Sequence, residues 1–448
     1  MSGCRRKSRL EIRDQLTFLM DTLNAAMVEW TDVSRRMRHK WFMKLLYLTP
    51  HKIWPLTSGN RLRNYHLARQ LAMHGSVTLV EMCYAGEEGS RPPDDCGFDQ
   101  VIRLEKSVGY SAAKLIRGMV GPTPLTLLNY YEPRLASQLA TILGRGRFNA
   151  VHFGGFHVSS YFSVGEAAPG CPTILIDWHN VESELMKRYS ETTRSWPRRL
   201  VAQRTATLLE RSELQLLERC RTHTVASERE REKLISRSPS ATVRVIPNGV
   251  DTRYFSPTEI AETPSTMPSG SDRNLLFVGS MDYHANINAV LWFARNVWPE
   301  IARRHSDLRF VIVGRDPAPA VRELKSERIL VTGTVDDVRP YYRSALAVVV
   351  PLRVGSGTRL KILEAMAAEV PIISTKLGAE GLDVTDNVHL LIADSGPDLI
   401  AAMDHLRSSP ETRSRLAREA RALVTRRYDW SVVGAGLYAV YRDLMKSP

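Results

Sequence analysis

The fold of this 448-residue chain is limited above all by its short apolar runs, which alternate with helical segments. The first series begins at "MKLLYLTP" and continues, after a small-residue loop and an amphipathic segment, with "VTLVEM". A second series begins at "NLLFVGSM" and continues through "RFVIVG", "ILVTGTV", "LAVVVPL", "VPIIST" and "HLLIA". Largely apolar strands separated by helices are typical of parallel sheets that are covered on both faces. The sequence therefore predicts an α/β fold with two doubly wound, Rossmann-like domains that face a cleft.

The chain is too long for one ordinary core, and we expect it to be divided into five segments. They are a basic extension (1–43), a first Rossmann-like domain (44–256), a linker or exposed insertion (257–272), a second such domain (273–428) and a final helix (429–448). The stretch "SPTEIAETPSTMPSGSD" marks the linker because it is rich in Pro, Ser and Thr. One helix is expected from about Ala289 to Ala302. The final helix carries an apolar stripe: Trp430, Val433, Leu437, Val440 and Leu444.

The composition favours anionic partners, because the formal net charge is +13. Nucleotide diphosphates, acidic lipid surfaces and nucleic acid all meet this condition. No run of about 18 apolar residues occurs, so we expect no membrane span, and the N-terminus lacks the apolar core of a signal peptide. The five cysteines are scattered without metal-type spacing. We therefore expect a cytoplasmic protein with reduced thiols and no metal site.

Ligands of such sheets bind beyond the carboxyl ends of the strands, and several small-residue or polar loops occur there. "LTSGN" contains Gly59, and "VGSMDY" contains Gly279 and Ser280. Glycine lets a ligand approach the backbone closely, although an ordinary turn between strand and helix would also explain it. "DWHNVE" places His179 just beyond an apolar strand, where the ring would face the cleft. His179 is a candidate donor to a ligand hydroxyl or to a developing charge, with a structural role as the alternative.

The stretch "VGSGTRLKILEAM" predicts an anion-binding helix start. Its candidate residues are Ser356, Gly357, Thr358, Arg359, Lys361 and Glu364. The glycines allow a sharp turn, Thr358 is a suitable N-cap, and the free N–H groups of the first turn attract an anion. Arg359 and Lys361 add full charges, and a partly buried Glu364 would accept hydrogen bonds from a ribose diol. The alternative is a surface helix with a salt bridge between Lys361 and Glu364.

Other polar features support weaker hypotheses. The arginine-rich helical segment from about Pro197 to Cys220 is either a solvated face or a surface that docks on anionic lipid. His157 is a second, weaker candidate for the cleft, whereas His152 lies inside a strand and is expected to be structural. Asp336 and Asp337 are adjacent carboxylates that point in different directions, so we interpret them as turn residues.

From about Lys44 to its end, the chain resembles glycosyltransferase family 4, retaining enzymes with the two-domain GT-B fold. The motifs "VIPNGVD", "VPLRVGSGTRLKILEAMAAEVPIIST" and "YDWS" carry the resemblance in this order. It implies transfer of a hexose from a nucleotide diphosphate sugar to a glycan, a lipid-linked or a small-molecule acceptor, without a cofactor or metal. It also implies a role in polysaccharide or glycoconjugate biosynthesis, and a final helix that crosses back to the first domain.

The resemblance assigns roles to individual donor-binding residues. It places Glu364 on the nucleotide ribose, Gly357 and Thr358 on the diphosphate, and Gly59 close to the donor phosphate. His179 matches the active-site histidine that contacts the donor sugar. Val335 lies where the family binds the base through its backbone.

Two positions depart from the family pattern. Ser356 replaces the first Glu of the family's Glu-seven residues-Glu motif, and Ser280 and Met281 stand where Arg and Lys are common. We therefore expect Arg359 and Lys361 to supply the missing positive charge to the diphosphate.

Three alternatives to a transferase remain. One is a nucleotide-sugar epimerase on the same fold, and the second is a non-catalytic nucleotide-sugar-binding scaffold, which the loss of the first Glu suggests. The third is a nucleic-acid-binding protein, suggested by the charge alone, because no RNA- or DNA-binding motif is found. For the transferase, the charge also predicts an anionic membrane surface as a partner, on the inner face of the membrane.

Overall fold

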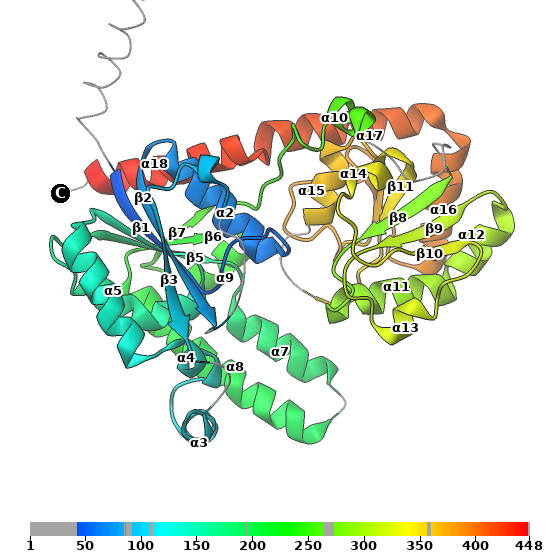
Figure 1. Ribbon diagram of the computed structural model, residues 1–448. Helices are drawn as coiled ribbons and strands as arrows, with labels where there is room; N and C mark the ends of the chain where they lie inside the picture. Colours follow the sequence, from blue (N-terminus) through cyan, green and yellow to red (C-terminus); the bar gives the residue numbers. More distant parts are fainter. Residues whose placement is uncertain are drawn as a thin grey trace, which may run out of the picture.

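Two parallel sheets form separate halves of the molecule (Figure 1). The computed structural model describes residues 43–84, 86, 92–107, 111–193, 195–263, 273–355 and 360–446. The first sheet has seven strands in the order β3-β2-β1-β4-β5-β6-β7, and the second has six in the order β10-β9-β8-β11-β12-β13. In each sheet the strand order reverses direction beside its first strand, which is the arrangement of a doubly wound fold. The predicted α/β architecture is confirmed.

The first half contains mostly short strands with helices between them. Its strands are β1 (Met43–Thr49), β2 (Gly75–Tyr84), β3 (Gln100–Lys106), β4 (Ala150–Phe153), β5 (Thr173–Trp178), β6 (Thr222–Val225) and β7 (Thr242–Val245). Its helices are α2 (Gly59–Ala72), η1 (Asp94–Cys96), α3 (Ala112–Val120), α4 (Leu125–Tyr130), α5 (Pro133–Gly146), η2 (Phe156–Tyr161), α6 (Phe162–Glu166), α7 (Glu182–Thr192), α8 (Trp196–Arg219) and α9 (Glu228–Arg237).

The second half repeats this alternation. Its strands are β8 (Asn274–Val278), β9 (Arg309–Val313), β10 (Ile329–Val331), β11 (Ala345–Val350), β12 (Ile372–Ser374) and β13 (Leu391–Ile392). The helices are α10 (Pro257–Glu262), α11 (His284–Asn296), α12 (Trp298–Arg304), α13 (Pro319–Arg322), α14 (Arg339–Arg343), α15 (Leu360–Ala367), α16 (Gly396–Ser408), α17 (Pro410–Arg427) and α18 (Trp430–Lys446).

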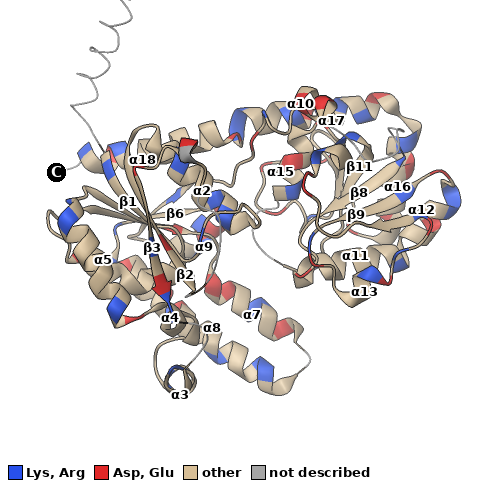
Figure 2. Ribbon diagram, viewed as in Figure 1, with Lys and Arg blue, Asp and Glu red and all other residues tan. Residues whose placement is uncertain are grey.

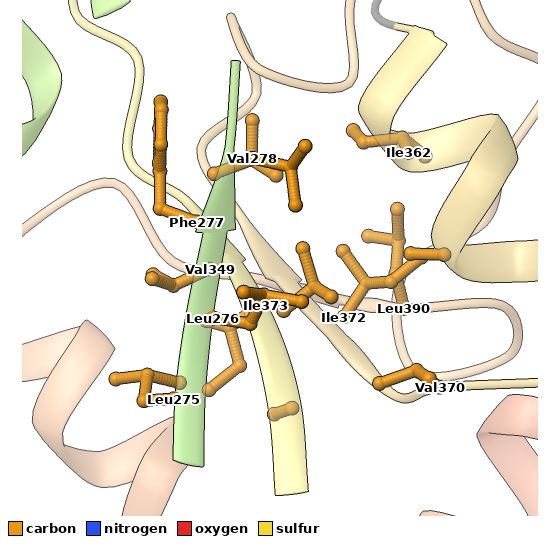
Figure 3. Packing of buried hydrophobic residues seen from close by; sticks show 14 of the residues in the cluster. Leu275, Leu276, Phe277, Val278, Val349, Ile362, Val370, Ile372, Ile373 and Leu390 are labelled. Atoms are coloured by element: carbon orange, nitrogen blue, oxygen red, sulfur yellow. The ribbon is translucent and has the colours of Figure 1, made fainter. Parts of the chain in front are cut away.

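Burial of apolar strands on both faces stabilises each sheet. Every residue of β8 is buried, and its Phe277 and Val278 lie among other apolar side chains of the second core (Figure 3). Ile362 extends from α15 into the same core, so this helix is fixed against the sheet by its apolar face. A fully buried aliphatic or aromatic side chain contributes about 1.5–3 kcal/mol. The helix that starts beside the cleft is therefore held firmly in place.

The final helix crosses from the second half to the first, as the resemblance implied (Figure 1). The indole ring of Trp430 stacks on the ring of His66 in α2, with 4.7 Å between ring centroids. Further along, the Tyr441 hydroxyl lies 2.9 Å from Nδ1 of His152. His152 is fully buried and stacks on Tyr47, so the predicted structural role of this histidine is confirmed. Helix α18 thereby connects the two halves.

Three local predictions differ from the structure. The expected helix Ala289–Ala302 is two helices, α11 and α12, because Pro299 has no N–H to continue the ladder and Val297 forms the junction. The predicted α18 stripe left out Tyr441, which is buried in the first half, whereas Val440 and Leu444 pack against the same core partly buried. Residues 257–262, expected in the linker, form α10, whose Ile260 is buried in the second core. Within the described ranges, no helix is both long and apolar enough to cross a membrane.

Candidate active site

A cavity of about 970 Å³ lies between the two halves. Its walls come from the start of α2, the loop around Gly249–Phe255, the loop after β8, helix α15 and the start of α18. The lining residues include Gly59, Gly279, Ser280, Lys361 and Glu364, which the sequence had singled out. Segments far apart in the chain therefore meet at one site, at the carboxyl ends of β1 and β8.

Glu364 lies on α15, where it lines the cavity and is partly buried. Burial raises the pKa of this carboxyl above its usual value, and a hydrogen bond from the Tyr342 hydroxyl to Oε2, 2.9 Å long, opposes that shift. Tyr342 is itself buried, so this bond fixes the rotamer of Glu364. Oε1 has no comparable partner among the hydrogen bonds of the described residues. The carboxylate is suited to accept hydroxyl donors from a ligand.

Lys361 lies one turn before Glu364 and crosses toward the loop after β8. Its ammonium donates to Oδ1 of Asn286 at 2.7 Å and lies 4.1 Å from the ring centroid of Phe277. Gly279 makes room for both side chains, since a Cβ there would lie 2.8 Å from the Lys361 Nζ and from the Asn286 Nδ2, and both would have to shift. The small residue in this loop therefore leaves room for a positive charge at the cavity wall.

Arg315 is a cavity-lining cation that the sequence analysis missed. It follows β9 in "VIVGRD", and its Nε donates to Oγ of Ser280 at 2.9 Å. Asp282 lies 3.7 Å from the same guanidinium and accepts from Ser280 at 2.5 Å. Its position directly after a strand and Gly314 could have indicated that Arg315 faces the ligand site. A cation from the strand next to β8 therefore lies beside Ser280, in addition to Lys361.

Gly59 lines the cavity where the two halves approach each other. It is the first residue of α2, and a Cβ there would lie 3.2 Å from Cδ1 of Leu360 on α15. Ser58 caps α2 by accepting from the backbone N–H of Arg61. The starts of α2 and α15 therefore approach the same space from opposite sides.

His179 directly follows β5, and 9% of its side chain is exposed. Its Nε2 is 3.3 Å from Oδ2 of Asp177, a distance without hydrogen-bond geometry. Asp177 is fully buried and bound by two guanidinium N–H groups of Arg63, each at 2.7 Å, which hold the pKa of its carboxyl well below its usual range. This buried pair, also missed from sequence, fixes the strand end that carries His179. Among the residues described around the main cavity, His179 is not a lining residue.

Val335 and Asp337, which were also singled out in the sequence, are not among the lining residues of the cavity. Val335 packs against the second core, and the neighbouring Val338 lines the cavity instead. Asp337 accepts from the backbone and side chain of Arg339 at the start of α14, which confirms it as a turn residue. The four residues Ser356, Gly357, Thr358 and Arg359 lie outside the described residues.

Among the described residues, the cavity thus combines Glu364, whose Oε1 is open, with the cations Lys361 and Arg315 near the loop after β8 and Arg69 on α2. Carboxylates bind vicinal hydroxyls, and cations bind the oxygens of a diphosphate. Its size is sufficient for a nucleotide that carries a sugar, because small-molecule sites of about 300–1,000 Å³ bury ligands of drug size.

Comparisons with known proteins place the chain among glycosyltransferases. Residues 62–254 match the family described as Glycosyltransferase Family 4, and residues 272–409 match the family described as Glycosyl transferases group 1. The phosphatidyl-myo-inositol mannosyltransferase of Mycolicibacterium smegmatis is 30% identical over 206 residues, which cover 44% of this chain and 51% of that protein. An uncharacterized protein from the cps region of Klebsiella pneumoniae is 25% identical over 130 residues, 27% of this chain and 34% of its own. The chain thus aligns with about half or less of these relatives' lengths.

Solved structures show the same fold along nearly the whole chain. The sucrose-phosphate synthase of Thermosynechococcus elongatus superposes with a TM-score of 0.70 at 18% identity, covering 90% of this chain and 100% of that structure. HepE of Anabaena, in complex with UDP-glucose, has a TM-score of 0.58 at 14% identity, with 90% and 100% covered.

Proposed function

The chain belongs to glycosyltransferase family 4 and has the two-domain GT-B fold, and we propose that it transfers a hexose from a nucleotide diphosphate sugar to an acceptor. The observation that carries this proposal is the convergence of Glu364, Lys361 and Gly279 on one cavity between the two sheets. The ribose hydroxyls would bind Glu364. The diphosphate would lie between the start of α15 and the loop after β8, close to Lys361 and Arg315.

The proposed chemistry is stabilisation of a departing diphosphate. Breaking the sugar–phosphate bond leaves positive character on the sugar and negative charge on the nucleotide. Fixed cations in a site that excludes water stabilise such charge, and this term is commonly the largest in catalysis. Lys361 is held by Asn286, so it needs little reorganisation. Arg359, outside the described residues, stays a predicted contributor. We infer that these cations act without a metal ion.

Retention of the anomeric configuration is part of the proposal. The acceptor hydroxyl would attack from the face that the diphosphate leaves, and a diphosphate oxygen would take its proton. His179 is proposed to orient the sugar from the end of β5. Closure of the two halves would exclude water from the reacting bond.

A donor screen tests the class. Thermal shifts are measured with UDP-, GDP-, ADP- and TDP-sugars, and with the Gly279→Ala and Gly144→Ala variants. Gly279→Ala should reduce the shift, because its Cβ would lie 2.8 Å from the Lys361 ammonium, which would have to move. Gly144 is the control, since nothing lies within 4 Å of a Cβ there. If no nucleotide sugar stabilises the wild-type protein, or if both variants respond as the wild type does, the proposal is wrong.

The partner surface that we propose is an anionic membrane, contacted by α3 and the start of α8. On α3, Leu115, Ile116, Met119 and Val120 are between 39% and 77% exposed, and none of its residues is buried. On α8, Trp196, Leu200 and Val201 are 74%, 57% and 63% exposed. The Arg204 guanidinium donates to the Gly121 carbonyl at 2.8 Å, which ties the two helices together.

Charge complements this apolar surface. Neither 111–121 nor 195–205 contains an Asp or Glu, whereas Lys114 and Arg117 lie in the first and Arg198, Arg199 and Arg204 in the second. Figure 2 shows basic segments along α8 below the first sheet. Apolar side chains beside cations are the composition of an interfacial membrane contact. We therefore propose peripheral association with the cytoplasmic leaflet.

Vesicle sedimentation tests this surface. The protein should bind vesicles of phosphatidylcholine and phosphatidylglycerol more strongly than phosphatidylcholine alone, and Leu200→Ser with Val201→Ser should reduce binding about tenfold. Met73→Ser is the matched control, because Met73 is 63% exposed on the end of α2. Equal binding to both vesicle types, or equal losses in the two variants, would contradict the docking surface.

A further inference from the structure

A second recess of about 300 Å³ adjoins the donor cavity on the side of the first sheet. It is lined by residues from the ends of β1, β2 and β3 and from α4, including His51, Tyr84, Lys106 and Tyr130. Thr57, Ser58 and Arg315 line both spaces. A molecule held in this recess would therefore lie beside the proposed donor site.

Lys106 is the unusual residue of the recess. It is the last residue of β3, it is only 3% exposed, and its Nζ lies 4.3 Å from the ring centroid of Tyr84 and 4.0 Å from that of Tyr130. No carboxylate and no hydrogen-bond acceptor is found for this ammonium among the described residues. A buried charge without a counterion is unfavourable, and two aromatic faces offset only part of that cost.

The other charged groups of the recess have the same sign. Arg61 donates to the Pro55 carbonyl at 3.2 Å and to Oγ1 of Thr57 at 3.3 Å, both neutral partners. In the described ranges, the carboxylates paired with Arg315 are Asp282 and Asp316, at 3.7 and 4.0 Å. Burial, reinforced by neighbouring histidines and Lys106, lowers the pKa of His51 to about 3, so its ring is neutral. No Asp or Glu is among the described lining residues.

We propose that this recess binds a phosphate group of the acceptor, with Lys106 and Arg61 as its main ligands. The inference rests on the proposed transferase function and narrows the acceptor to a phosphate-bearing molecule. Three cations, one of them buried with no anion beside it in the described part of the chain, suit the negative charge of a phosphate. The shared wall at Thr57 and Ser58 would place a hydroxyl of the same molecule beside the donor sugar.

Calorimetric titration with inorganic phosphate tests the site while saturating UDP, or whichever nucleoside diphosphate stabilises the protein most, occupies the donor cavity. Wild-type protein should bind phosphate under these conditions, and Lys106→Met should weaken binding about tenfold or more. Lys106→Arg keeps the charge and should retain most of the affinity. Lys44→Met is the matched control, because Lys44 also lies over an aromatic ring, 5.7 Å from the Phe148 centroid, and is exposed.

Two results would overturn the inference. One is unchanged phosphate affinity in Lys106→Met, with nucleotide affinity and melting temperature showing that the variant is folded. The other is competition between phosphate and the nucleotide, which would make the recess part of the donor diphosphate site. If no nucleotide binds at all, the transferase proposal fails, whereas titration of the nucleotide-free protein still tests the recess.

The source of the phosphate is distinguished by two further probes. Glycerol 3-phosphate represents a soluble acceptor, and dihexanoyl phosphatidate represents a lipid headgroup with chains. At least tenfold tighter binding of the lipid would identify a lipid-borne phosphate, and equal affinities would identify a soluble one. Failure of both probes to bind would overturn the site.

Discussion

Replacement of Glu364 by alanine should remove the ability of the protein to recognise ribose. Among the described residues, only Tyr342 is seen to donate to this carboxylate, and only to Oε2, so at least one full hydrogen bond from the ribose diol is available at Oε1. A hydrogen bond to a charged group contributes about 1.5–3 kcal/mol. The expected loss of nucleoside diphosphate affinity is therefore about 10- to 150-fold.

A double-mutant cycle isolates that contact from general damage. Calorimetry would compare UDP with 2′,3′-dideoxy-UDP on the wild type, on Glu364→Ala and on Glu327→Ala. Glu327 is the control because it is exposed and is not among the lining residues of the cavity. Wild type and Glu327→Ala should prefer UDP by about tenfold or more, and Glu364→Ala should not discriminate. If Glu364→Ala keeps the full preference for UDP, the carboxylate does not contact the ribose, and the placement of the donor is refuted.

Three further perturbations follow from the same geometry. Tyr342→Phe keeps the ring packing and removes only the hydroxyl donor, so it should lower nucleotide affinity about three- to tenfold and raise the pKa of Glu364 further. In a pH series of UDP binding, the inflection should move to higher pH, and an unchanged profile would argue against this coupling. Lys361→Met should lower turnover of a bound donor about 100-fold or more while leaving the melting temperature within a few degrees, and turnover that persists in EDTA would agree with cations acting without a metal. Acid should destabilise the fold below about pH 6.5, because burial lowers the pKa of His51, His66 and His152 to about 3, so that only the unfolded chain takes up these protons. At pH 5.5 each histidine should lower the free energy of unfolding by about 1.4 kcal/mol. A melting temperature that stays constant from pH 7.5 to 5.5 would contradict this prediction.

Local pattern was sufficient to predict most strands, the two sheets and the final helix, but it missed β3. Those elements depend on runs of apolar residues, which any parallel sheet buried on both faces requires. The same reasoning placed Glu364 on a partly buried helix face, because its neighbours at helical spacing are apolar. It overlooked the division between α11 and α12, although Pro299 was visible in the sequence.

Long-range partners could not be predicted from the sequence. Tyr342, which donates a hydrogen bond to Glu364, lies 22 residues from it in the chain, and Arg63 lies 114 residues from its partner Asp177. Such pairs depend on how strands and helices are arranged in space, and periodicity carries no information about them. For the same reason, the sequence did not indicate that Lys106 is buried beside two aromatic rings, or that Arg315, which follows a strand in an ordinary turn, lines the cavity. His179 follows a strand end as predicted, but it is not among the lining residues of the main cavity.

The central claim is that the chain breaks a sugar–phosphate bond in the cavity between the sheets. Proton NMR of the purified protein with the donor that stabilises it most follows this reaction directly. We predict release of the nucleoside diphosphate, with the sugar appearing in water or on an acceptor in the anomeric configuration of the donor, and a strong loss of the signal in Lys361→Met. An intact donor after prolonged incubation with acceptor, despite binding, would contradict the claim, as would an epimerised sugar that appears without any acceptor.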